Sequence, residues 1–266
     1  LTTKAVGQIT STASMAANLA QCRVAIQKAA AAGAAALFLP EASDYIASSA
    51  TESMSLVRSV EESEFVTGLQ EEARRFKIPI HVGVHEPGAA GKVKNTVIWI
   101  DEKGDITQRY QKLHLFDVEI EGSPIIRESD SVERGTEMPT AFDTPVGRVG
   151  PAICFDLRFP EIGLAHRRQG ADIITYPSAF TIPTGQAHWE VLLRARAIET
   201  QTYVIAAAQA GQHNQKRRSY GHSMIVDPWG RIVAQLKEES PEIATAEISF
   251  DLLKSIQAKI PLVRQM

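Results

Sequence analysis

Apolar and polar positions along the chain alternate between a spacing typical of strands and one typical of helices. Residues 4–10 and 35–40 are short apolar runs of the kind that form buried strands, and residues 14–33 between them have helical spacing. A second helix is predicted over 60–76, because this amphipathic stretch starts with acidic residues and leads into the apolar run 78–85. The N-terminal third therefore reads as strand, helix, strand, helix, strand.

Turn signals divide the middle of the chain into hairpins. Segments 95–101 and 105–116 flank the turn Asp101–Gly104, and this pattern predicts two paired antiparallel strands. Segment 140–155 contains its own turn residues and predicts another hairpin. Residues 117–138 are polar and rich in turn residues with no clear period, so we expect a long loop there.

The second half of the chain repeats the alternation of helices and strands. We expect helices over 159–171, 187–201 and 250–260, strands over 171–177, 202–209 and 242–249, and a hairpin over 219–236. No linker, composition shift or short internal repeat divides the chain. Hairpins mixed with β-α units predict an α/β fold, a sandwich of sheets with helices outside, in one domain spanning residues 1–266.

Composition and charge narrow the class of partner. The chain has 266 residues with 44% hydrophobic and 22% charged side chains, so it can bury a large core without metals or disulfides. A net charge of -3 gives no electrostatic reason to expect nucleic acid or an anionic membrane as partner. No apolar run is long enough to cross a bilayer and no signal peptide is visible, so we expect a cytoplasmic protein, or a mitochondrial one if a leader is missing.

The chain has two cysteines, Cys22 and Cys154. Two cysteines do not make a disulfide framework, and a reducing compartment is the simpler interpretation, although sequence alone leaves a disulfide open. Cys22 lies in a predicted helix and is most simply a small core residue. Cys154 ends a strand-like run and needs a separate explanation.

Three apolar runs each end in a reactive side chain, namely Glu41, Lys112 and Cys154. Each alone has an ordinary explanation: a solvated loop acid, a surface cation and an inert buried thiol. Together they match a nucleophilic site, since a thiol with a pKa of ~8.5 needs a base or a cation to attack efficiently. Glu41 can take the thiol proton, and Lys112 can stabilise the negative charge on a carbonyl oxygen, with the Phe155 backbone N–H as a second donor.

The segments that carry these residues resemble a known family. LPEASDY, YQKLHLFD and AICFDLRFPE resemble, in order and spacing, the three signature segments of the nitrilase superfamily. The resemblance continues through PSAFTIPTGQAHWEVLLRARAIETQTYV and SYGHSMIVDPWG, and so covers nearly the whole chain. Within the superfamily the chain is most similar to the Nit branch, which contains deaminated glutathione amidase and ω-amidase.

This resemblance implies a four-layer αββα sandwich, an amidase without cofactor or metal, and a triad of Glu41, Lys112 and Cys154. It also implies a further catalytic acid, for which we favour Glu128, in a Glu-Ser pair, over Glu121. A homodimer formed through the 187–199 helix and the C-terminal segment is implied as well.

The implied substrate is the amide of an α-keto acid, with deaminated glutathione favoured and a thioester intermediate. Alternatives are an ω-amidase acting on α-ketoglutaramate or α-ketosuccinamate, and a catalytically weak member that binds partners. Arg158 and Arg194 are candidates to bind a substrate carboxylate. The basic loop 216–219 is either a solvated loop or part of the pocket mouth.

A Cys-His catalytic pair and a metal site are the two alternatives to the triad of Glu41, Lys112 and Cys154. A Cys-His hydrolase is the main rival, with His114, His188 and His222 as candidates, although each histidine is more simply a hydrogen-bonded core or rim residue. A metal site is less favoured, because the histidines are scattered and neither an H-E-x-x-H motif nor a cysteine pair with ligand spacing occurs.

Overall fold

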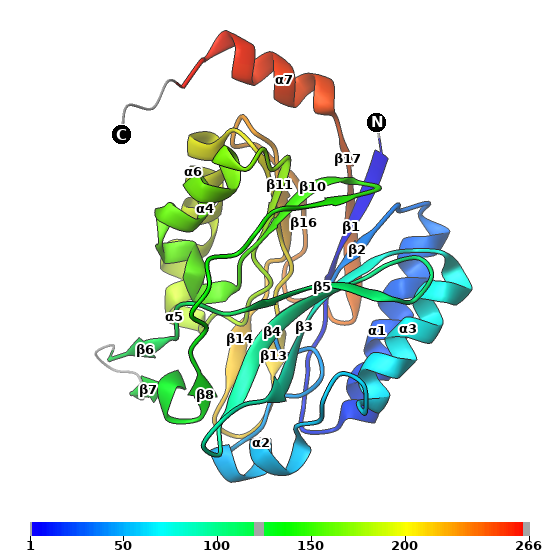
Figure 1. Cartoon of the computed structure of the whole chain (residues 1–266), viewed down its shortest axis with the longest axis vertical. Helices are drawn as coiled ribbons and strands as arrows, with labels where there is room; N and C mark the ends of the chain where they lie inside the picture. Colours follow the sequence, from blue (N-terminus) through cyan, green and yellow to red (C-terminus); the bar gives the residue numbers. More distant parts are fainter. Residues whose placement is uncertain (1, 120–124, 263–266) are drawn as a thin grey trace.

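Two β-sheets lie face to face, and helices cover the outer face of each sheet, as Figure 1 shows. The structure is a computed structural model that describes residues 2–119 and 125–262. The order of layers is helix, sheet, sheet, helix, so the predicted αββα sandwich is confirmed.

The first sheet has the strand order β17-β1-β2-β3-β4-β5, and the short strand β8 pairs with β4. Strands β1, β2 and β3 are parallel, whereas β17, β4 and β5 run antiparallel to their neighbours. The strand bounds are β1 (Thr2–Gln8), β2 (Leu37–Phe38), β3 (Ile80–Pro87), β4 (Val93–Ile100), β5 (Ile106–Gln111), β8 (Val132–Glu133) and β17 (Glu242–Ile248).

The second sheet has the strand order β16-β15-β12-β11-β10-β9, with β10, β11 and β12 parallel. Two small two-stranded sheets, β13–β14 and β6–β7, lie outside it. The bounds are β9 (Phe142–Thr144), β10 (Gly147–Pro151), β11 (Ile173–Thr175), β12 (Tyr203–Ala206), β15 (Met224–Val226), β16 (Ile232–Gln235), β13 (Ala210–Gln212), β14 (Arg218–Tyr220), β6 (Asp117–Val118) and β7 (Ile126–Arg127).

Helices α1 and α3 pack on the first sheet, and α4 and α6 pack on the second. Serine side chains cap the N-termini of α1 and α3. Ser14 accepts a hydrogen bond from the Ala17 N–H and Ser63 accepts one from the Val66 N–H, which satisfies backbone donors in the first turn of each helix. The helix bounds are α1 (Met15–Ala31), α2 (Ala50–Leu56), α3 (Glu64–Phe76), α4 (Pro160–Arg168), α5 (Ile182–Thr184), α6 (Glu190–Thr200) and α7 (Phe250–Lys259), with single turns η1 (Glu128–Asp130), η2 (Cys154–Arg158) and η3 (Gly185–Trp189).

Alternation along the strands divides the core into three layers. Ala5 packs with residues of α1 and α3, whereas the next residue, Val6, faces the second sheet. In the second sheet Ile173 faces the first sheet and Ile174 packs with residues of α4 and α6. Because successive side chains in a strand point to opposite faces, near-continuous apolar strands are the expected pattern for sheets buried on both sides.

The predicted elements differ from the structure at three places. The long loop predicted over 117–138 is wrong in part, because β6, β7, η1 and β8 lie within its described residues. The helix predicted from residue 60 begins at Glu64, after the capping Ser63. The short helix α2 was not predicted at all.

Both cysteines are free and buried, so no disulfide joins Cys22 to Cys154. Within residues 2–119 and 125–262, no helix combines the length and the apolar character needed to cross a membrane.

Candidate active site

Three strand ends from two sheets meet at one site. Glu41 follows β2 and Lys112 follows β5, both in the first sheet, and Cys154 follows β10 in the second sheet. The Lys112 N–H donates to the carbonyl of Asn95 at 2.9 Å, and the Cys154 N–H donates to that of Pro177 at 3.0 Å. The strand ends and these backbone bonds therefore fix the reactive side chains where the two sheets face each other.

The Lys112 ammonium joins two carboxylates in the buried part of the site. Its Nζ lies 3.0 Å from Glu41 Oε1, and 3.0 and 2.9 Å from Oε1 and Oε2 of Glu128. Lys112 is 2% exposed and Glu41 is 4% exposed, so little water screens these contacts. The structure thus brings Glu128 to the predicted triad, whereas Glu121 lies outside the described residues.

Asn95 connects the same two carboxylates and was not predicted from the sequence. Its Nδ2 donates to Glu41 Oε1 at 2.7 Å and to Glu128 Oε1 at 3.2 Å. The Phe116 N–H donates to Glu128 Oε2 at 2.6 Å. Glu41 and Glu128 are therefore held by hydrogen bonds as well as by Lys112, with few other orientations available to them.

Cys154 lies on a sharp turn between β10 and η2. Its φ is +47°, a region that non-glycine residues enter rarely and that is common at functional sites. Asp156, two residues later, is fully buried and accepts from the Ile153 N–H at 3.0 Å and the Tyr110 hydroxyl at 2.8 Å. Its other oxygen accepts from the His114 N–H at 3.0 Å. Asp156 therefore ties the cysteine turn to the segment that carries Lys112.

Burial and charge set the protonation states in this cluster. Burial would lower the pKa of Lys112, but Glu128 and Glu41 raise it well above its ordinary value. Burial would raise the pKa of Glu41, but the charge of Lys112 and polar contacts with Cys154, Lys112 and Asn95 hold it below its ordinary value. The resting cluster therefore contains an ammonium and a carboxylate.

The cysteine is a neutral thiol in this state. Burial and the negative charge of Glu41 raise the pKa of Cys154, while Lys112 and the backbone of Ala179 act in the opposite direction with smaller effects. A thiol with a raised pKa beside an ionised carboxylate needs that carboxylate as a base in order to attack.

A cavity of about 820 Å³ opens onto the cluster, and Glu41, Asn95, Lys112, Glu128 and Cys154 are among its lining residues. This volume lies within the range typical of small-molecule sites. A second cavity of about 500 Å³ lies beside β5 and is lined by none of these five residues.

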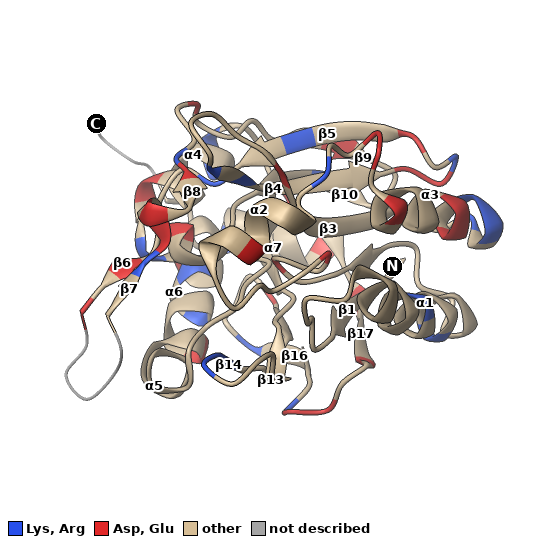
Figure 2. Ribbon diagram, turned by 90° about the horizontal axis from the view of Figure 1, so that it is seen from below, with Lys and Arg blue, Asp and Glu red and all other residues tan. Residues whose placement is uncertain are grey.

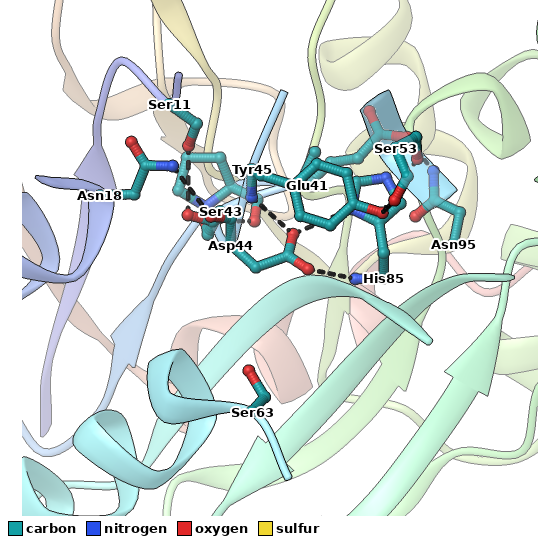
Figure 3. Close-up of polar contacts among 12 residues, drawn as sticks. Ser11, Asn18, Glu41, Ser43, Asp44, Tyr45, Ser53, Ser63, His85 and Asn95 are labelled. Carbon is teal, nitrogen blue, oxygen red and sulfur yellow. Dashed lines mark hydrogen bonds and ion pairs between the residues drawn. The ribbon is translucent and has the colours of Figure 1, made fainter. Parts of the chain in front are cut away.

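The wall next to Glu41 is built around the buried carboxylate of Asp44 (Figure 3). Asp44 Oδ2 accepts from the His85 N–H at 2.8 Å, and Oδ1 lies 2.9 Å from His85 Nδ1. The ring of Tyr45 stacks on that of His85 with 4.3 Å between centroids, and its hydroxyl lies 2.9 Å from Ser53 Oγ. These contacts fasten the segment after Glu41 to β3 and α2, and so fix one side of the cavity.

The other predicted binding residues lie in different places. The Phe155 side chain lines the cavity. Arg158 is not among the lining residues; its guanidinium lies 5.7 Å from the Phe155 ring centroid and 3.2 Å from His188 Nδ1, and burial lowers its pKa. Arg194 lies on α6 and donates to the Gly230 carbonyl at 2.8 Å, so the structure does not bring it to the cluster.

The three candidate histidines bond elsewhere, which removes the support for a Cys-His pair. His114 Nδ1 lies 2.8 Å from Asp156, His188 lies against Arg158, and His222 Nδ1 lies 2.9 Å from the Tyr220 carbonyl. In the part of the chain that the structure describes, no group of three or more His, Cys, Asp or Glu residues is arranged to hold a metal ion.

The chain belongs to the carbon–nitrogen hydrolase family, whose model matches residues 3–258. It is 48% identical over 269 residues to a probable hydrolase, nit2, of Schizosaccharomyces pombe, covering 100% of this chain and 98% of that protein. It is 45% identical over 268 residues to the deaminated glutathione amidase of Bos taurus, covering 97% of this chain and 80% of that protein. The crystal structure of the C. elegans NitFhit protein superimposes with a TM-score of 0.92 at 42% identity, covering 98% of this chain and 63% of that one.

Proposed function

We propose that the protein is an amidase that cleaves the γ-amide of deaminated glutathione through a thioester on Cys154. The observation that carries this proposal is the contact of one buried Lys112 ammonium with two carboxylates beside a neutral thiol. The name of the bovine relative supports the choice of substrate.

Acylation begins when Glu41 takes the thiol proton as the sulfur attacks the amide carbon. The carbonyl oxygen gains negative charge and is stabilised by Lys112 and by the Phe155 N–H, which belongs to the first turn of η2, where backbone donors lack intrahelical acceptors. Glu41 passes its proton to the departing amine, the carbon–nitrogen bond breaks, and a thioester remains.

Deacylation uses the same groups. Glu41, again ionised, removes a proton from water, and the resulting hydroxide attacks the thioester carbonyl. The sulfur leaves and regains the proton from Glu41, which releases the acid and restores the thiol. Glu128 keeps Lys112 charged and in place through both steps.

Asn95 is expected to act as a positioning residue through Glu41. The Asn95→Ala variant should lower kcat/KM by about tenfold to a hundredfold, since a hydrogen bond to a charged group is worth about 1.5–3 kcal/mol. Loss of this donor also raises the pKa of Glu41, so the acid limb of the pH profile should move to higher pH.

Thr96→Val on the same strand is the matched control, because Thr96 Oγ1 is buried without a hydrogen-bond partner in the described part of the chain. It should leave both the rate and the pH profile unchanged. An Asn95→Ala variant with a lower rate but an unshifted acid limb would show that Asn95 does not act through Glu41.

Turnover of two substrates tests the proposed function. We expect kcat/KM for deaminated glutathione to exceed that for α-ketoglutaramate, and the opposite order would assign the protein to the ω-amidase activity. If no amide on a panel releases amine or ammonia, the alternative of a partner-binding member replaces the amidase.

We also propose the homodimer predicted from the sequence. Val191 and Ile198 on α6 are 67% and 51% exposed, and Trp229, whose neighbour Gly230 lies against Ile198, is 51% exposed, which is unusual for such large apolar side chains. Light scattering in solution should give twice the chain mass of 29.0 kDa, and a single-chain mass would exclude the dimer.

A further inference from the structure

One part of the cavity wall is basic. Lys216, Arg217 and Arg218, here called the basic rim, line the same cavity as Cys154. All three side chains are exposed. Arg218 Nη2 lies 3.3 Å from Glu238 Oε2, whereas within residues 2–119 and 125–262 neither Lys216 nor Arg217 forms an ion pair with a carboxylate.

Lys216 and Arg217 lie in the turn of the β13–β14 hairpin and Arg218 begins β14, and the turn is held by its own side chains. Asn214 Oδ1 accepts from the N–H groups of Lys216 and Arg217 at 2.9 and 3.0 Å, which closes the turn. Asn214 Nδ2 donates to the Ala47 carbonyl at 3.4 Å, on the wall that follows Glu41. The rim therefore has a defined position relative to the cavity.

The same hairpin is attached to neighbouring segments at both of its ends. His213 is buried, and its Nδ1 lies 2.8 Å from the Ser11 carbonyl. The Tyr220 N–H donates to the Phe180 carbonyl at 2.9 Å, next to the α5 segment that also lines the cavity. Figure 2 shows the basic positions of β14 beside α5. Such attachment reduces the ordering cost of binding a ligand at the rim.

Charge differs between the two parts of the cavity. At the floor, the carboxylates of Glu41 and Glu128 and the ammonium of Lys112 leave one net negative charge. The basic rim and Arg127, which also lines the cavity, are all positive. A substrate with an anionic group is therefore repelled at the floor and attracted at the rim, which orients its neutral amide toward Cys154.

We propose that the basic rim is a binding subsite for a carboxylate carried by the amine half of the scissile amide. This inference rests on the proposed function, because the amine half of deaminated glutathione is a dipeptide that ends in a carboxylate. That half is the longer of the two arms around the γ-amide, so its charged end lies several bonds from the reacting carbon. The rim then selects amides that release an acidic peptide over amides that release ammonia.

Two substrates with the same acyl half provide the test. Deaminated glutathione and α-ketoglutaramate form the same thioester, so deacylation is identical and only binding and acylation can differ. In the Lys216→Gln/Arg217→Gln variant, kcat/KM for the peptide substrate should fall about tenfold, since each exposed charge pair contributes up to about 1 kcal/mol. The value for α-ketoglutaramate should remain within twofold of wild type.

A variant with the same charge change elsewhere is the control. Lys103→Gln/Arg231→Gln removes two exposed positive charges at hairpin turns that do not line the cavity, and it should change neither substrate. Raising the salt concentration should weaken the wild-type preference for the peptide and leave the rim variant unaffected, because exposed charges are screened over ~8 Å at physiological ionic strength.

Two results would overturn the proposal. Unchanged kcat/KM values for both substrates would remove the rim from the site, and an equal fall for both substrates would assign it to the shared acyl half. Calorimetric measurement of deaminated glutathione binding to the Cys154→Ala variant distinguishes failure of the subsite proposal from failure of the proposed function. Binding that weakens about tenfold with the rim substitutions supports the subsite even without turnover, whereas unaffected or absent binding rejects it.

Discussion

Replacement of Cys154 by alanine is expected to abolish amide hydrolysis and to leave the fold intact. The thiol is the only nucleophile that the cluster offers beside Glu41 and Lys112 in the described part of the chain, and the other two groups are held as an ion pair at 3.0 Å. Loss of a nucleophile costs several orders of magnitude, so the residual rate should be below about a thousandth of wild type.

Cys22→Ala is the matched control for this experiment. Cys22 is fully buried in the layer between α1 and the first sheet, and its removal should change the rate little. The two variants are compared by steady-state rates with circular dichroism as the check on folding. If the Cys22→Ala variant is inactive and the Cys154→Ala variant is active, the nucleophile is Cys22 and not Cys154.

Replacement of Lys112 by alanine is expected to reduce kcat by on the order of a hundredfold or more, with little change in KM. The ammonium meets a charge that exists only after the thiol attacks, so its removal affects the transition state more than the bound substrate. It also leaves Glu41 and Glu128 together without a counterion. Without the ammonium the pKa of Glu41 should rise, which weakens its support as the ionised base.

Lys94→Ala tests whether loss of any lysine near this part of the first sheet has the same effect. Lys94 precedes Asn95 on β4 and points to the opposite face, so its loss should leave kcat unchanged.

Because breaking a buried ion pair costs about 3–5 kcal/mol, the Lys112→Ala variant needs a folding check. Lys112→Met/Glu128→Gln keeps the net charge of the cluster the same and is the variant to use if the single variant unfolds. Normal kcat with raised KM would mean that Lys112 binds a substrate carboxylate instead.

The order of the elements and two of the three central side chains could be predicted from the sequence for one physical reason, whereas β5 before Lys112 is largely exposed. Strands buried on both faces are apolar throughout, so a reactive residue at the end of such a run is conspicuous. Glu41 and Cys154 each follow a run of this kind, and both lie at the site. The resemblance to the nitrilase superfamily added Glu128, which lies in a segment without periodicity.

Asn95 and Asp156 could not be found in this way, because their roles depend on contacts between distant segments. Asn95 lies 54 positions from Glu41 along the chain, and Asp156 lies 46 positions from Tyr110. Each resembled an ordinary polar residue at the start of a strand or after one. The short helix α2 was missed for a related reason, since a helix of seven residues depends on tertiary packing more than on its own sequence.

Arg194 shows the limit of choosing residues by charge alone. A basic side chain near a motif suggests a carboxylate ligand, but α6 directs Arg194 toward Gly230 and Glu190. Residues 216–218 of the predicted basic loop, by contrast, line the cavity although 62 positions separate Lys216 from Cys154 in the chain. The path of the β13–β14 hairpin through the fold, and not distance along the sequence, brings these basic side chains to the cavity.

The central claim is a covalent acyl intermediate on Cys154, and mass spectrometry of rapidly quenched enzyme tests it most directly. Wild-type protein is mixed with excess deaminated glutathione, quenched in acid within the first turnover, digested and mapped. We expect the α-keto acyl group on the peptide that contains Cys154, its release by hydroxylamine, and no adduct in the Cys154→Ala variant. An acyl group on any other residue, or turnover by the Cys154→Ala variant, would contradict the account.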